Sequence, residues 1–163
     1  MIRECGEQDL EFLEHCLPTG ENRAHEAHFR RQQQGLGTLL VAWIDEMPCG
    51  TCVINWTGPI HPAARVAFPD CPELCFLQIA AVSRNQGIGT ALIAAVEERV
   101  LARGLTHVGL AVEVTNADAL RLYKRLGYID TGLVATTEYS VWDEFGVKKD
   151  LVETDCYLLK ELG

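Results

Sequence analysis

The feature that most constrains this chain is an apolar strand that runs into a glycine-containing turn and then into an amphipathic helix. Residues 74–82 are nearly all apolar, which is typical of a strand buried on both faces of a sheet. Residues 87–103 repeat apolar side chains at helical spacing, and Gly104 follows as a C-cap. Gly87 and Gly89 lie where the strand meets the helix. This unit favours a mixed α/β architecture.

The turn between this strand and this helix suits a phosphate-containing ligand. Glycine lacks Cβ, so the backbone can approach a ligand closely. The first N–H groups of a helix have no partner within the helix and lie at the positive end of its dipole. A pyrophosphate at this position is bound by backbone donors and by the dipole together. A glycine turn with no ligand is the alternative.

Two common phosphate-binding motifs do not match this turn. A P-loop requires Gly-Lys-Ser/Thr, whereas Gly89 is followed by Thr90 and Ala91. The dinucleotide fingerprint requires a small residue where Leu92 stands and an acidic residue about 20 positions later, near His107. Both motifs are therefore excluded.

The rest of the chain reads as one domain, residues 1–163, in which strands and helices alternate. The pattern predicts strands at residues 1–5, 38–44, 51–56, 107–112, 128–139 and 154–160, and helices at residues 8–17, 21–34 and 117–126. The polar stretch 142–150 joins the last two strands. Residues 57–73 form a long loop with four prolines. Such loops are often functional, and a surface insertion is the equal alternative.

Charge and hydropathy exclude several classes of partner. The 163 residues include 23 Asp and Glu against 14 Lys and Arg, a net charge of −9. This charge repels nucleic acid and anionic membranes, and it favours a cationic partner such as an amine. No apolar run approaches the ~20 residues that span a bilayer. The N-terminus shows no basic-then-apolar leader. We therefore expect a cytoplasmic protein with no nucleic-acid or membrane partner.

The seven cysteines include two close pairs, Cys49/Cys52 and Cys71/Cys75. The odd number and the missing secretory signal favour reduced thiols. Four thiolates at this spacing would also suit zinc. However, Cys49 and Cys75 occupy apolar positions, where a free cysteine acts as a small hydrophobic side chain. We expect no metal, and the role of the pairs is open.

Three histidines also need an interpretation. His25 and His28 lie three residues apart on the polar helix at residues 21–34, where a solvated face is expected and substrate contact is the alternative. His61 lies in the long loop and has no assigned role.

Two motifs resemble those of the GNAT N-acetyltransferase superfamily. The family's acetyl-CoA motif reads Arg/Gln-x-x-Gly-x-Gly/Ala, and this chain has Arg84-Asn85-Gln86-Gly87-Ile88-Gly89. Its second hallmark reads Asn-x-x-Ala-x-x-Leu-Tyr-x-x-x-Gly-Phe/Tyr. The chain matches it with Asn116, Ala119, Leu122, Tyr123, Gly127 and Tyr128. Residues 74–128 match closely, and the rest matches in layout.

The resemblance implies an α/β (α+β) GNAT fold. Its mixed, mostly antiparallel sheet has about six to seven strands, helices on both faces, and fourth and fifth strands that splay apart. It implies an acyltransferase that moves an acetyl group from acetyl-CoA to a primary amine by direct transfer in a ternary complex. Protein N-terminal or lysine acetylation and a non-catalytic acyl-CoA sensor are the alternatives. A homodimer is also open.

The resemblance also assigns a cofactor site. The pantetheine arm would lie between the splayed strands, and the backbone N–H of Ile79 would hold the oxyanion. Asn116 would reach the arm while also capping its helix. Arg84 either contacts the nucleotide or is solvated. The full set is Leu77, Gln78, Ile79, Arg84, Asn85, Gln86, Gly87, Ile88, Gly89, Thr90, Asn116 and Tyr123.

Tyr123 matches the family's general acid, which protonates the leaving CoA thiolate. A tyrosine of ordinary pKa, about 10, can donate a proton at neutral pH; a core tyrosine is the alternative. The Glu that serves as base in ribosomal-protein N-terminal acetyltransferases falls at Ala111 here. Glu113, on the same strand face, and Glu73, at the mouth of the fourth strand, are the candidate bases. Gln78 could hold a relay water but cannot act as a base, and water relay to bulk solvent is a further alternative.

The acceptor is expected to be a small cationic amine. Several acidic residues lie in segments that border the acceptor site in this family: Glu21, Glu26, Asp70, Glu73, Asp143 and Glu144. No motif in those segments identifies the acceptor.

Overall fold

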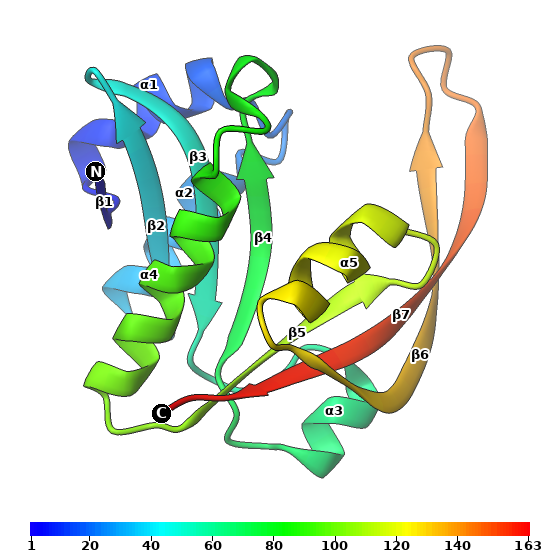
Figure 1. Ribbon diagram of the computed structural model, residues 1–163. Helices are drawn as coiled ribbons and strands as arrows, with labels where there is room; N and C mark the ends of the chain where they lie inside the picture. The colour runs from blue at the N-terminus through cyan, green and yellow to red at the C-terminus, as the bar shows by residue number, and fades with distance from the viewer.

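The computed structural model describes residues 1–163, which form a seven-stranded sheet in the order β1-β2-β3-β4-β5-β7-β6 (Figure 1). Neighbouring strands are antiparallel except for β4 and β5, which are parallel. The strands are β1 (Ile2–Glu4), β2 (Gly37–Ile44), β3 (Met47–Asn55), β4 (Glu73–Ile79), β5 (His107–Glu113), β6 (Ile129–Trp142) and β7 (Lys148–Glu161). This is the expected mixed, mostly antiparallel sheet.

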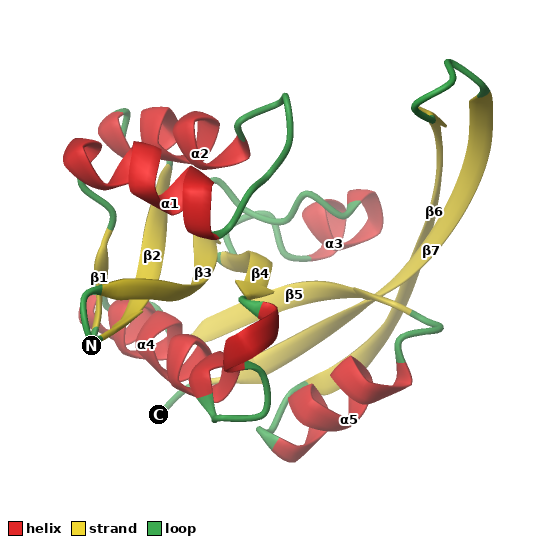
Figure 2. Cartoon of the chain, turned by 90° about the horizontal axis from the view of Figure 1, so that it is seen from above, coloured by secondary structure: helices red, strands yellow, loops and turns green.

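Helices cover both faces of the sheet (Figure 2). They are α1 (Leu10–Cys16), α2 (Ala24–Gln33), α3 (Pro62–Ala67), α4 (Ile88–Ala102) and α5 (Ala117–Arg125). The first three lie on one side, and α4 and α5 lie on the other. No helix is both long and apolar enough to cross a membrane.

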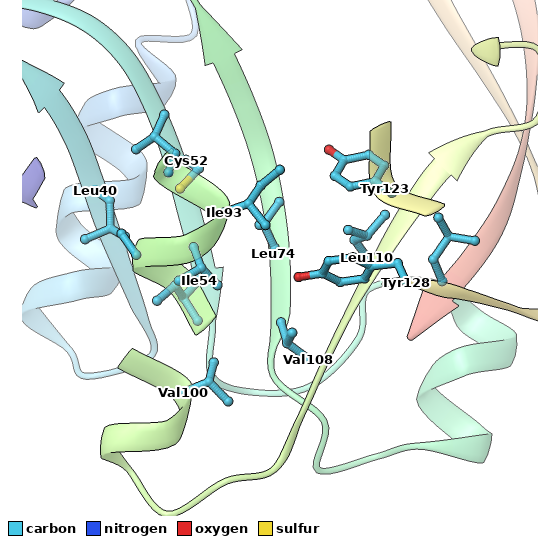
Figure 3. Close-up of a cluster of buried hydrophobic side chains, with 14 of the residues drawn as sticks. Leu40, Cys52, Ile54, Leu74, Ile93, Val100, Val108, Leu110, Tyr123 and Tyr128 are labelled. Carbon is cyan, nitrogen blue, oxygen red and sulfur yellow. The ribbon is translucent and has the colours of Figure 1, made fainter. Parts of the chain in front are cut away.

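Each face of the sheet has its own hydrophobic core. Leu39 and Val41 pack with the α1 and α2 side chains Leu13 and Phe29. The neighbouring residue Leu40 points to the opposite face, into a larger cluster around α4 (Figure 3). Alternate side chains of one strand thus fill two cores, which explains why β2 is apolar along its whole length.

The strands β4 and β5 splay apart, as the resemblance implies. Glu73 and Gly109 are their only register pair. Beyond this pair β5 diverges from β4, while it stays paired with β7 along its whole length (Figure 1). A bulge at Phe76, where φ is 53°, also interrupts the pairing of β4 with β3. An extra residue at a bulge bends a strand and re-aims side chains.

The connection at residues 57–73 is not wholly irregular, because it contains the short helix α3. The four prolines concealed this helix in the sequence. Pro62 stands in its first turn, where a missing N–H costs nothing. The His61 side chain accepts a hydrogen bond from the Ala64 N–H and caps the helix.

The polar stretch at residues 142–150 was wrongly placed outside the sheet. The strand β6 continues to Trp142, and β7 starts at Lys148 rather than at Thr154. The two strands form a hairpin that projects beyond the body of the sheet (Figure 1). Both of its faces meet water there, so the hydrophobic pattern that marks a strand is missing.

Three other element ends differ from the prediction. The second helix begins at Ala24 rather than Glu21, and β3 begins at Met47, inside the predicted turn. The strand β4 ends at Ile79, and a 3₁₀ turn at Ala81–Ser83 follows. Ends of elements are decided by local capping and pairing, which periodicity does not reveal.

All seven cysteines are free thiols. Cys49, Cys52 and Cys71 are buried, and burial raises the pKa of each of these thiols and of Cys75. No group of three or more His, Cys, Asp or Glu side chains is arranged to hold a metal ion.

Candidate active site

A cleft of about 840 Å³ opens beside the splayed strands, between β4, the start of α4 and the start of α5. Ten of the residues assigned to the cofactor line it: Leu77, Gln78, Ile79, Arg84, Asn85, Gly87, Ile88, Gly89, Thr90 and Asn116. Five further residues line it that were not assigned to the cofactor: Ser83, Asp118, Ala119, Leu122 and Arg125. The fold thus gathers two segments that are distant in the sequence around one cavity.

The turn at the bottom of the cleft presents backbone donors. Asn85 and Gly87 adopt left-handed conformations, with φ of 62° and 79°. Asparagine and glycine are the residues that tolerate this region best. No side chain caps α4, so the N–H groups of its first turn are free. A Cβ added at Gly89 would meet no atom within 4 Å, so the chain leaves this surface open to a ligand.

Two cations offset the acidic character of the chain at this cleft. Arg84 lies in the turn itself, and Arg125 lies at the end of α5. With the positive end of the α4 dipole, they make a local anion-binding surface on a protein of net charge −9. Arg125 carried no sequence signal, because only the packing of α5 brings it to the cleft.

Asn116 holds both of its expected positions. Its side-chain Oδ1 accepts a hydrogen bond from the Ala119 N–H at 3.2 Å and so caps α5. It also lines the cleft. Helix capping and contact with a cofactor are therefore compatible at this residue.

The backbone N–H of Ile79 points to the side of β4 on which β5 splays away. The next residue, Ala80, donates its N–H to the Cys49 carbonyl on β3 at 2.9 Å. Successive N–H groups of a strand point to opposite sides, so the Ile79 N–H points away from β3. It is available as a donor where the two strands separate.

Tyr123 does not line the cleft but borders it from the core. It is 8% exposed, and its ring packs edge-on against Tyr128 with centroids 5.8 Å apart. Figure 3 shows the ring extending from α5 toward β4. Burial raises the pKa of Tyr123 to about 12, so the hydroxyl stays protonated at neutral pH and is a proton donor.

Gln86, which was assigned to the cofactor, does not line the cleft. It is exposed, and its side-chain amide donates a hydrogen bond to the Val82 carbonyl at 3.3 Å.

A second pocket, of about 180 Å³, lies on the opposite face of the sheet, under α2. It is lined by Thr19, Ala24, His25, His28, Leu39, Thr51, Val53, Phe76, Leu77 and Gln78. Leu77 and Gln78 line both this pocket and the large cleft. The two cavities therefore lie on either side of the same short stretch of β4, next to the bulge.

Phe76 and His28 form one wall of this second pocket. The bulge turns the Phe76 side chain toward α2, where its ring centroid lies 4.5 Å from that of His28. The prediction that His25 and His28 form a solvated face of the helix is wrong. His25 is buried and bonds through Nε2 to the Leu17 carbonyl at 2.7 Å, and burial lowers the pKa of His28. The helix carries so few apolar residues that its inner face was not recognisable.

Glu73 lies at the end of β4 that still pairs with β5, on the sheet face that carries α1 and α2. Only 2% of it is exposed, and it accepts a hydrogen bond from the Ile60 N–H at 2.9 Å. Burial raises the pKa of its carboxyl to about 7. A carboxyl with this pKa can both take up and release a proton near neutral pH.

Glu113 ends β5 and lies on the same face as Ala111, opposite the core residues Leu110 and Val112. Its register partner on β7 is Asp155, and Glu153 lies two residues from Asp155 on the same face. None of these three carboxylates forms an ion pair. Burial raises the pKa of both Glu153 and Asp155, and the charge of Glu113 raises it further.

Three of the acidic residues expected around the acceptor have other partners or positions. Glu26 is paired with Arg23 and Arg30. Asp143 accepts hydrogen bonds from two N–H groups in the hairpin turn. Asp70 lines a separate cavity of about 340 Å³ near His107. The acidic surface is instead the trio Glu113, Glu153 and Asp155, which becomes visible only when β5 pairs with β7.

Comparisons with known proteins agree with this architecture. The model of the acetyltransferase (GNAT) family matches residues 7–128. Two similar structures are the ribosomal-protein-alanine N-acetyltransferase from Brucella melitensis (22% identity, TM-score 0.70, 99% of each chain covered) and an N-acetyltransferase from Staphylococcus aureus Mu50 (14%, 0.71, 100% of this chain and 98% of that one). A third is a GNAT family acetyltransferase from Elizabethkingia anophelis with acetyl-CoA bound (18%, 0.62, 99% and 97%). No curated protein matches the chain.

The fold and the cleft define an acyltransferase of the GNAT type. The chain belongs to the GNAT acetyltransferase family.

Proposed function

We propose that this protein transfers an acetyl group from acetyl-CoA to a primary amine, directly and without a covalent enzyme intermediate. The observation that carries this proposal is that the large cleft and the pocket under α2 share Leu77 and Gln78. A cofactor that enters along one face and an acceptor that enters along the other would meet at the bulge of β4. Acetyl-CoA supplies the activated acyl group as a thioester.

The chain's own groups fit the cofactor from end to end. The N–H groups of the first turn of α4 bind the pyrophosphate, with Arg84 and Arg125 beside them. The arm lies along β4, where Asn116 closes the other side of the cleft. The free N–H of Ile79 holds the carbonyl oxygen of the acetyl group as negative charge develops on it.

Tyr123 and Glu73 are the proton donor and acceptor of this proposal. Tyr123 stays protonated and lies between α5 and β4, so it donates to the leaving thiolate. Glu73 takes the proton of the attacking ammonium through water, because its carboxyl is too buried to touch the acceptor. Glu113 is less suited to this role, because it stands among like charges.

The acceptor is a cationic amine. The carboxylates of Glu113, Glu153 and Asp155 lie together on the acceptor face and have no cationic partner within the chain. Like charges on directly opposite residues of two strands repel, and a cation between them relieves this. The Phe76 and His28 rings provide an aromatic wall for the apolar part of the same molecule.

A peptide α-amine is the second candidate acceptor. Two of the similar structures are ribosomal-protein-alanine N-acetyltransferases, from Brucella melitensis and Escherichia coli. At 22% and 18% identity the likeness extends to the fold. Ala111 stands where those enzymes are expected to carry their Glu.

The first experiment is thermal melting with acetyl-CoA, with NAD and ATP as controls. Ligand at 100 times its Kd is expected to raise the Tm by about 5–11 °C in a domain of this size. No shift at millimolar acetyl-CoA overturns the transferase proposal.

The second experiment measures the release of CoA thiol with spermidine, lysine amide, an Ala-starting peptide and a simple monoalkylamine of single charge. Turnover fastest with the polycation supports the cationic acceptor. Turnover only with the peptide supports the second candidate. Binding without turnover on any amine favours an acyl-CoA sensor instead.

A further inference from the structure

The proposed mechanism leaves one buried hydroxyl unused. Tyr157 on β7 is fully buried, and its hydroxyl makes no hydrogen bond within the chain. The Cys71 thiol approaches this hydroxyl but donates to the Pro72 carbonyl at 3.5 Å. A buried donor without a partner destabilises the fold, so a hydroxyl kept at such a site needs an explanation.

The fold makes room for this hydroxyl beside Glu73. Gly109 is the register partner of Glu73 on the neighbouring parallel strand. A Cβ at Gly109 would overlap the Tyr157 hydroxyl. The Tyr157 hydroxyl therefore occupies the space that a side chain at position 109 would need.

The spacing of the two strands fixes how far this hydroxyl lies from the Glu73 side chain. Paired residues of adjacent parallel strands point their Cβ atoms to the same face, and the strands lie about 4.8 Å apart. The hydroxyl therefore lies about one strand spacing from the Cβ of Glu73, on the face to which the Glu73 carboxyl extends.

The Tyr157 ring is also held in place. The His61 ring packs against it with centroids 5.6 Å apart. His61 accepts from the Ala64 N–H through Nδ1, so its Nε2 carries the proton and donates to the Asp155 carbonyl at 3.2 Å. These two bonds tie α3 to β7 and fix the ring that covers Tyr157. Glu73 accepts only one hydrogen bond within the chain, from Ile60.

We propose that Tyr157 is a positioning residue, whose hydroxyl donates a hydrogen bond to the ionised carboxylate of Glu73 in the ternary complex. This rests on the proposed role of Glu73 as the proton acceptor. The hydroxyl stays protonated, because burial and the nearby Glu73 charge both raise its pKa. The bond aims the carboxylate and stabilises its charged form, and no covalent bond is made or broken at Tyr157.

The deciding experiment compares the wild type with Tyr157→Phe by ¹³C NMR titration of the Glu73 carboxyl, identified from its loss in Glu73→Gln. Tyr139→Phe, on the exposed part of β6, is the matched control. Loss of a donor to the charged form is expected to raise the pKa of Glu73 by about half a unit or more, in acetyl-CoA-saturated protein. An unchanged titration overturns the proposal.

Kinetics with the best amine of the panel provide the second readout. Tyr157→Phe is expected to lower kcat about tenfold and to move the acidic limb of the pH profile to higher pH, with the KM for acetyl-CoA unchanged. The Tm should not fall, because the variant removes a hydroxyl without a partner. A fall in Tm with loss of acetyl-CoA binding indicates a merely structural role and overturns the proposal.

Different results would contradict the role of Glu73 and the role of Tyr157. If Glu73→Gln keeps full activity, Glu73 is not the proton acceptor and the role of Tyr157 falls with it. If Glu73→Gln is inactive while Tyr157→Phe behaves as Tyr139→Phe does, only the role of Tyr157 is wrong.

Discussion

The Glu73 carboxylate accepts its one hydrogen bond from the backbone N–H of Ile60, at 2.9 Å. This bond joins the long connection between β3 and β4 to the end of β4 that still pairs with β5. The connection therefore does more than cover the surface, because it buries a carboxyl that water would otherwise ionise freely. Burial is what brings the pKa of this carboxyl to about 7.

The pH dependence of stability tests this burial without any substrate. The folded-state pKa of Glu73 lies above its unfolded value of 4.5, so its contribution is full below that value and is lost as the pH rises through about 7. Glu73→Gln keeps an oxygen for the Ile60 N–H but cannot ionise. We expect its Tm to exceed that of the wild type by several degrees at pH about 8.5 and by much less at pH about 5. Equal differences at both pH values would contradict the raised pKa.

Tyr123→Phe separates chemistry from packing. The variant keeps the ring and its edge-on contact with Tyr128. We expect kcat to fall about 100-fold, while the Kd for acetyl-CoA and the Tm stay close to wild type. Steady-state kinetics and calorimetric titration measure these quantities. A kcat within a factor of two of the wild type would remove Tyr123 from the mechanism.

Gly89→Ala is expected to stabilise the protein and to weaken the cofactor. Gly89 lies in the first turn of α4 with open space around its Cβ position, and Gly in a helix costs about 0.5–1 kcal/mol relative to Ala. The added methyl occupies the surface where the pyrophosphate binds. The melting temperature without ligand should rise slightly, and the Kd for acetyl-CoA should rise at least about tenfold. Unchanged affinity would place the pyrophosphate elsewhere.

Asn116 has two roles that two substitutions can separate. Asn116→Ala removes the cap on α5 and should cost about 1 kcal/mol of stability. Asn116→Ser restores a capping oxygen, so its stability should return close to wild type. Because the serine side chain is too short to reach the arm, the affinity for acetyl-CoA should stay reduced in both variants. Full affinity in Asn116→Ser would mean that the cap is the only role.

Neutralising the acidic face should affect polycationic acceptors more than singly charged ones. Glu113→Gln and Asp155→Asn each remove one charge from facing positions of β5 and β7. The KM for spermidine should rise several-fold at low salt and less at high salt, because such interactions are screened. The KM for a simple monoalkylamine, which carries a single charge, should change little. Equal effects on both amines would argue against a second cationic group in the acceptor.

The sequence by itself determined the strand–turn–helix unit around Gly87 and Gly89 and the layout of the sheet through β5. These features are local, since a glycine is needed where the backbone turns left-handed and an apolar run is needed where a strand is covered on both faces. The cofactor residues could be predicted from the family motifs because each motif is also a local stretch of the sequence. Ten of these residues line one cleft, while their contact with acetyl-CoA stays a prediction.

Only the tertiary structure decided the rest of the candidate site. The burial of Glu73, the acidic trio on β5 and β7 and the pocket wall of Phe76 and His28 join residues from separate segments. The Tyr157 hydroxyl occupies the place of a Gly109 side chain, and these two residues are 48 positions apart in the sequence but lie on adjacent strands. Spacing along the chain carries no record of such pairings, because they arise when long-range strand contacts and the bulge at Phe76 set the register.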